Sequence, residues 1–121
     1  MLQDLFYKVL TMQRQDNSIQ AILEINKESE IFKGHFPGQP ILPGACMLQL
    51  VKEVLSISLG FHIRLLKAEY LKFLKLINPL NNNIIQLTLS FKELDNSIYV
   101  IAILISDKVI FFKLKGSFIA E

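Results

Sequence analysis

The chain has little that would cross-link it, charge it strongly or anchor it in a membrane. Cys46 is its single cysteine, so no disulfide can form within the 121 residues. The net charge is +2, and no run of about five or more like charges marks a disordered tail or a nucleic-acid-binding arm. No stretch of about 18 apolar residues is present, and the early Asp4 argues against a signal sequence. We therefore expect a cytoplasmic protein with no nucleic-acid partner and no membrane span.

Apolar residues are slightly more abundant than in an average globular domain, at 51% of the sequence. The length suits one domain over residues 1–121, which can bury about two-thirds of the surface of the unfolded chain. The extra apolar residues could fill a large core, an interface between subunits or a tunnel for an apolar ligand. Composition alone does not separate these three.

One strongly apolar helix is predicted over residues 44–59, where apolar side chains recur at helical spacing. Gly60 is a suitable stop, and only Lys52 and Glu53 give the segment charge. Such a helix is too apolar for a surface position, so we expect other elements to wrap around it.

Most of the remaining chain alternates like β-strands. Residues 2–9 predict either a short helical turn or the approach to a first strand. Strands are predicted over residues 18–26, 65–77, 84–94, 97–106 and 109–120. The spacers Asp95-Asn96 and Asp107-Lys108 predict two-residue hairpins. Five or six antiparallel strands around one helix make an α+β domain.

The predicted strand 97–106 is apolar on both faces, which favours a central position or an interface. We therefore expect a homodimer or a larger homo-oligomer.

A rigid loop precedes the helix. Three of the five glycines and three of the four prolines lie within residues 34–44. Cys46 follows in the first helical turn, where the helix N-terminus can lower a thiol pKa, so a nucleophile is one interpretation. A small apolar residue on a buried helix is the simpler one. His35 and Cys46 lack further ligands at a recognised spacing, so no metal site is expected.

The stretch HFPGQPILPG, residues 35–44, resembles the signature H-F-P-G-x-P-x-x-P-G of the hotdog-fold 3-hydroxyacyl-acyl carrier protein dehydratases. Residues 67–79 resemble the family's second strand motif more weakly, because residues 78–81 read NPLN where the family has a Pro-Gly-Asp turn. The resemblance implies an antiparallel sheet wrapped around a central helix, with two protomers joined into one sheet. It also implies active sites between protomers.

The resemblance further implies a substrate and roles for the loop residues. The substrate would be a 3-hydroxyacyl thioester on the phosphopantetheine of an acyl carrier protein or on coenzyme A, and no other cofactor is expected. His35 would be the general base that removes the Cα proton, since imidazole titrates near neutral pH. Gly44 would donate its N–H to the thioester carbonyl at the helix N-terminus. The residues expected to contact the substrate are Phe36, Pro43, Ala45 and Cys46.

Gln49 departs from the family pattern, because the dehydratases have a carboxylic acid fourteen residues after the histidine. An amide forms hydrogen bonds but does not act as an acid at ordinary pH. Glu53 lies one helical turn further on, which we expect to be too distant to replace that acid.

Three hypotheses remain open. The protein is a dehydratase in which Gln49 positions the leaving hydroxyl, an acyl thioesterase in which Gln49 orients water, or a non-catalytic acyl-binding or partner subunit. Retention of His35 with the whole rigid loop favours the dehydratase.

Overall fold

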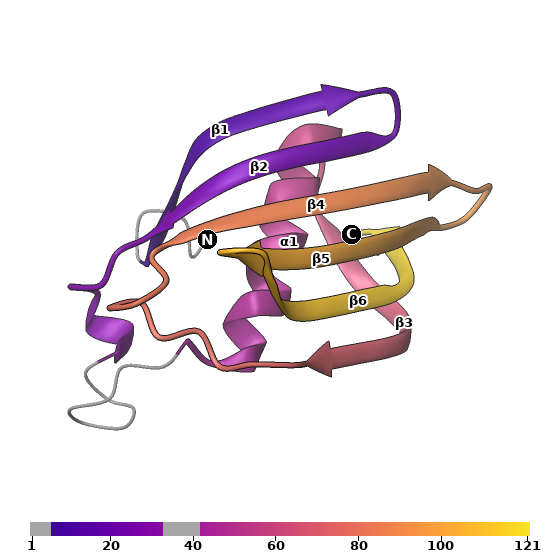
Figure 1. The fold of residues 1–121 in the computed structure, drawn as a ribbon. Helices are drawn as coiled ribbons and strands as arrows, with labels where there is room; N and C mark the ends of the chain where they lie inside the picture. The colour runs from indigo at the N-terminus through magenta and orange to yellow at the C-terminus, as the bar shows by residue number, and fades with distance from the viewer. Residues whose placement is uncertain (1–5, 33–41) are drawn as a thin grey trace.

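The computed structural model describes residues 6–32 and 42–121, which form one antiparallel sheet and one long helix (Figure 1). In chain order these residues contain β1 (Tyr7–Gln15), β2 (Ser18–Ile25), a short 3-10 helix (Glu30–Phe32), α1 (Gly44–Leu59), β3 (Ile63–Phe73), β4 (Ile84–Glu93), β5 (Ile98–Ser106) and β6 (Val109–Ala120). The sheet order is β1-β2-β4-β5-β6-β3, and every neighbouring pair is antiparallel. The predicted α+β architecture is confirmed.

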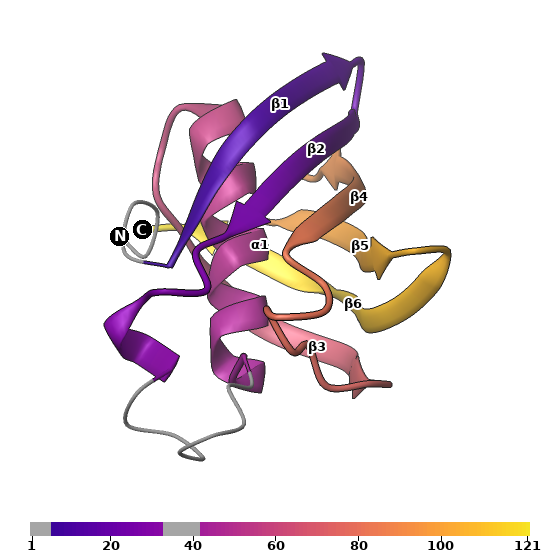
Figure 2. The same ribbon diagram turned by 60° about the vertical axis from the view of Figure 1, so that its left-hand side comes forward.

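The sheet curls around α1, which runs along its concave side (Figure 2). On β2 the alternate residues Ile19, Ala21, Leu23 and Ile25 are buried, while their neighbours are at least partly exposed. The helix contributes Leu50, among other fully buried side chains, to the same core. The predicted wrapping of an apolar helix by strands is therefore what buries the core.

The helix ends where the sequence predicts. Gly60 adopts a left-handed conformation with φ of 85°, and its N–H donates to the carbonyl of Ser56 at 2.9 Å. Glycine accepts this conformation without a Cβ clash, so it closes the last turn of α1.

The central position predicted for residues 97–106 is confirmed, since β5 lies between β4 and β6. Its turn to β6 is the predicted two-residue hairpin: Asp107 and Lys108 both have positive φ, 49° and 65°, as a type I′ turn requires. Of the two possibilities for the N-terminal segment, the strand is found from Tyr7 onward.

Two boundaries differ from the prediction. The β4–β5 connection has four residues rather than two, because the Leu94 N–H donates to the Ser97 carbonyl at 2.8 Å and closes a wider loop. The strand expected over residues 65–77 spans Ile63–Phe73 instead. Beyond it the chain leaves the sheet, and the Ile77 carbonyl accepts a hydrogen bond of 2.9 Å from Leu42 just before α1.

Candidate active site

The predicted site residues that the structure describes gather in the first two turns of α1. Pro43 immediately precedes the helix, and Gly44, Ala45, Cys46 and Gln49 lie within it. The remaining two, His35 and Phe36, lie outside the described residues.

The helix N-terminus follows directly after a proline. Pro43 occupies the N-cap position with φ −60° and ψ 145°, and proline has no polar side chain with which to cap the helix. Its carbonyl accepts from the Cys46 N–H at 3.0 Å. The first turn also contains no acidic residue to offset the positive end of the helix dipole. The N–H groups of Gly44 and Ala45 are therefore suited to binding a carbonyl oxygen that gains negative charge.

An aromatic ring lies directly against Gly44. A Cβ built on Gly44 would come within 2.9 Å of Phe73 Cε1, so the close approach depends on the absence of a side chain. Phe73 is the last residue of β3, is 51% exposed, and has its ring centroid 5.2 Å from that of Phe112. The end of β3 thus covers one side of the helix entrance.

One face of α1 leads from the helix entrance to the polar side chains of Gln49 and Glu53. Ala45, Gln49 and Glu53 are spaced four residues apart and therefore share one face of α1. Along this face exposure falls, from exposed Ala45 through half-buried Gln49 to Glu53, which is only 3% exposed. In the part of the chain that the structure describes, Glu53 is the one buried side chain of a charged residue.

Hydrogen bonds hold the side chains of Gln49 and Glu53 in place. Gln49 Nε2 donates to Glu53 Oε2 at 2.9 Å, and the buried hydroxyl of Tyr7 on β1 donates to Glu53 Oε1 at 2.8 Å. Both carboxylate oxygens act as acceptors, which fits an ionised carboxylate. The amide of Gln49 is therefore fixed by a group that is itself fixed to the sheet.

Cys46 is 8% exposed, and burial together with the nearby negative charge of Glu53 raises the pKa of its thiol. A raised pKa leaves less of the nucleophilic thiolate at neutral pH. The environment favours a packing role over a nucleophilic one.

Two members of this cluster were not foreseen as site residues. Glu53 gave a signal, since it is one of only two charged residues in an otherwise apolar helix. Tyr7 gave none, because 46 residues separate it from Glu53 and no local pattern reports so distant a contact.

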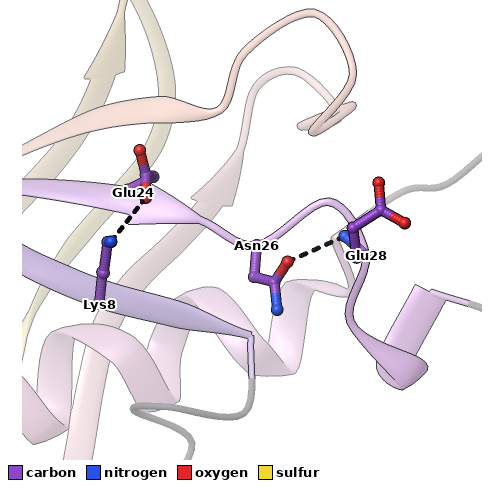
Figure 3. Close-up of polar contacts among 4 residues, drawn as sticks. All are labelled: Lys8, Glu24, Asn26 and Glu28. Atoms are coloured by element: carbon purple, nitrogen blue, oxygen red, sulfur yellow. Dashed lines mark hydrogen bonds and ion pairs between the residues drawn. The ribbon is translucent and has the colours of Figure 1, made fainter.

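A separate hollow of about 440 Å³ lies where β1 begins and β2 ends. Its walls include the ion pair of Lys8 Nζ with Glu24 Oε1 at 3.2 Å, and a turn in which the Glu28 N–H donates to Asn26 Oδ1 at 3.0 Å (Figure 3). None of the predicted site residues that the structure describes lines this hollow.

Within residues 6–32 and 42–121, no three or more His, Cys, Asp or Glu side chains gather in a way that could hold a metal ion. No helix of the described segments is long and apolar enough to cross a membrane.

Two solved structures show the same fold at low sequence identity. The dehydratase heterocomplex ApeI:P from Xenorhabdus doucetiae aligns with a TM-score of 0.74 and 20% identity, over 92% of this chain and 96% of that one. A hypothetical thioesterase with coenzyme A from Streptococcus pneumoniae TIGR4 aligns with a TM-score of 0.70 and 11% identity, over 98% and 89%. The sheet wrapped around α1 is the hotdog fold.

Sequence comparison gives the family. The 3-hydroxyacyl-[acyl-carrier-protein] dehydratase FabZ of Levilactobacillus brevis is 34% identical over 56 residues, which cover 42% of this chain and 38% of that enzyme. The corresponding enzyme of Haemophilus influenzae strain PittEE is 41% identical over 39 residues, 32% of this chain and 26% of the enzyme. These matches span well under half of each relative. Residues 11–110, however, match the model of the ApeI-like family, described as ApeI dehydratase, and the chain belongs to this family.

Proposed function

We propose that the protein eliminates water from a 3-hydroxyacyl thioester and forms the trans-2-enoyl thioester. The observation that carries this proposal is the fixed amide of Gln49 on a helix whose uncapped N-terminus lies one to two turns away. A site for this elimination must stabilise an enolate-like carbonyl and hold a leaving hydroxyl. The first amides of α1 suit the former task, and Gln49 suits the latter.

In the proposed reaction His35 removes the Cα proton, and the N–H of Gly44 binds the thioester carbonyl. The C–H electron pair forms the new double bond as the bond from Cβ to the hydroxyl breaks. The same His35 then gives its proton to the departing hydroxyl, which leaves as water. In this proposal both bonds lie on the same side of the substrate, so one imidazole can perform both transfers. Imidazole suits the task because its unperturbed pKa is close to neutral pH.

The acyl group would reach this site on phosphopantetheine, carried by an acyl carrier protein or by coenzyme A. Phe36, Pro43, Ala45 and Cys46 are proposed to contact the substrate. On the first turn of α1, Ala45 is exposed and Cys46 is buried, and both side chains are small.

We also propose that the protein pairs through the free edge of β3, either with a second copy or with a related hotdog subunit. β3 is an edge strand of the sheet, and Leu66 on it is exposed, as are Leu74 and Leu76 just beyond it. An open edge with apolar side chains favours pairing with another strand. The dehydratase heterocomplex of Xenorhabdus doucetiae provides a precedent for two different subunits.

The test is an assay of enoyl formation on 3-hydroxyacyl thioesters of several chain lengths, with release of free thiol followed in the same samples. His35→Ala should abolish enoyl formation. His62→Ala is the matched control, because it removes the other histidine, an exposed residue just beyond α1, and should leave the rate unchanged.

Thiol release without an enoyl product would identify a thioesterase instead. If neither product forms, alone or with a partner subunit, the proposal is refuted in favour of an acyl-binding role.

A further inference from the structure

The buried carboxylate of Glu53 takes no part in the reaction proposed above, although it is costly to bury. An ionised carboxylate in a protein interior needs several hydrogen bonds or a charge partner to offset its loss of hydration. Glu53 receives hydrogen bonds from two different elements, β1 through Tyr7 and its own helix through Gln49. We therefore asked what this buried carboxylate does beside the proposed reaction site.

Glu53 determines which end of the Gln49 amide faces outward. A carboxylate can only accept hydrogen bonds, so Gln49 must direct its NH₂ group toward Glu53. The carbonyl oxygen of the same planar amide then points away from Glu53. Without the carboxylate, either end of the amide could face either direction.

Tyr7 makes this arrangement rigid. Its hydroxyl donates to Oε1, while Gln49 donates to Oε2, so the two partners occupy different oxygens of Glu53. Because Tyr7 lies on β1, its hydrogen bond holds the Glu53 carboxylate against the sheet and restricts rotation of that side chain. The orientation of Gln49 is therefore fixed by the tertiary structure and not by α1 alone.

We propose that Glu53 is a positioning residue, which makes Gln49 a hydrogen-bond acceptor for the 3-hydroxyl group of the substrate. This inference rests on the proposed dehydratase function. The substrate hydroxyl donates its hydrogen to Gln49 Oε1, which leaves the lone pairs of the hydroxyl oxygen available to accept a proton. The leaving group is thus oriented to receive a proton without any acid at position 49.

Glu53→Gln tests the role in the reaction. The new amide at position 53 can accept from the Tyr7 hydroxyl and present its NH₂ group to Gln49, which must then turn its own carbonyl inward. We expect kcat for enoyl formation to fall about 10- to 100-fold, with KM changed far less, because the lost contact orients the leaving group. Glu24→Gln, which removes a partly exposed carboxylate of β2, is the control and should leave both constants unchanged.

Tyr7→Phe provides a second variant that keeps the carboxylate and nearly the same volume. It removes the hydrogen bond to Glu53 Oε1, so kcat should fall in the same direction but by less than in Glu53→Gln. Unchanged kcat in both folded variants would overturn the proposal.

The orientation itself is measured without activity, from the side-chain amide signals of ¹⁵N-labelled protein. The Gln49 NH₂ pair, assigned by its loss in Gln49→Met, should exchange slowly with water in the wild type and rapidly in Glu53→Gln. Slow exchange in an inactive wild type would refute the proposed function while supporting the orientation. Rapid exchange in the wild type would overturn the inference even if the protein is an active dehydratase.

Discussion

Gln49→Glu would place a second carboxyl group against Glu53 in the protein interior. Restoring the family's acid in this way should not yield two independent carboxylates, because the atoms now joined by the Gln49–Glu53 hydrogen bond are 2.9 Å apart. Two negative charges about 4 Å apart repel each other by about 4 kcal/mol at an effective dielectric constant of about 20. This corresponds to roughly three pKa units, so the pair should retain one proton up to about neutral pH.

The stability of this variant should depend on pH in a defined direction. The folded pair would hold a proton that the unfolded chain releases above the ordinary glutamate pKa of about 4.3. Folded protein then binds more protons than unfolded protein, so stability falls as pH rises, by up to about 1.4 kcal/mol per pH unit between about pH 4.5 and 7. Urea unfolding at several pH values, compared with the wild type, measures this difference.

The double variant Gln49→Glu with Glu53→Gln is the matched control. It exchanges the two groups, so it keeps one carboxyl and one amide in contact and should lack the extra pH dependence. If Gln49→Glu unfolds with the same pH dependence as the wild type, the two side chains are not in contact and the positioning role of Glu53 loses its basis.

Two other regions give independent predictions. Gly44→Ala should change the free energy of unfolding by less than about 1 kcal/mol, because the described atoms nearest to its Cβ belong to the half-exposed ring of Phe73, which can move. Gly116→Ala should cost about 1–3 kcal/mol, because its Cβ would lie 2.6 Å from the main-chain oxygen of Lys67 on β3; equal urea midpoints for the two variants would contradict this reasoning. Cys46 should be alkylated by iodoacetamide at pH 7.5 far more slowly in the folded protein than in urea, since burial and the charge of Glu53 raise its thiol pKa. Rapid labelling of the folded protein would show an accessible thiolate.

Local patterns were sufficient for most of the fold. The bounds of α1 follow from apolar spacing and Gly60, and the alternation over residues 18–26 predicts β2 with its buried face. The predicted strand bounds are wrong where contacts between residues far apart in the sequence determine the structure. Residues 74–77 continue the apolar pattern of β3, yet the chain leaves the sheet there and Ile77 binds Leu42 through the main chain.

In the candidate site, too, local sequence motifs were predictive and long-range contacts were not. Sequence resemblance pointed to the helix entrance and to Gln49 because both lie within one short motif or at a fixed spacing from it. The environment of Gln49 could not be predicted. Gln49 contacts Glu53, and Glu53 is held by Tyr7, which is 46 residues away in the sequence. Glu53 was expected to be too distant to replace the missing acid, and its contact with Gln49 instead gives it a different proposed task.

Edge strand β3 and the segment that follows it contact the start of α1 at two points. Its last residue, Phe73, lies against Gly44, and the segment that follows it holds Leu42 through the Ile77 carbonyl. A subunit that pairs with β3 would therefore also restrain the start of α1 at these two contacts. The affinity of β3 for a partner subunit and the affinity of the helix amides for a ligand are then coupled. A ligand that must displace Phe73 to bind would weaken pairing of the subunits. Pairing would weaken binding of that ligand by the same factor.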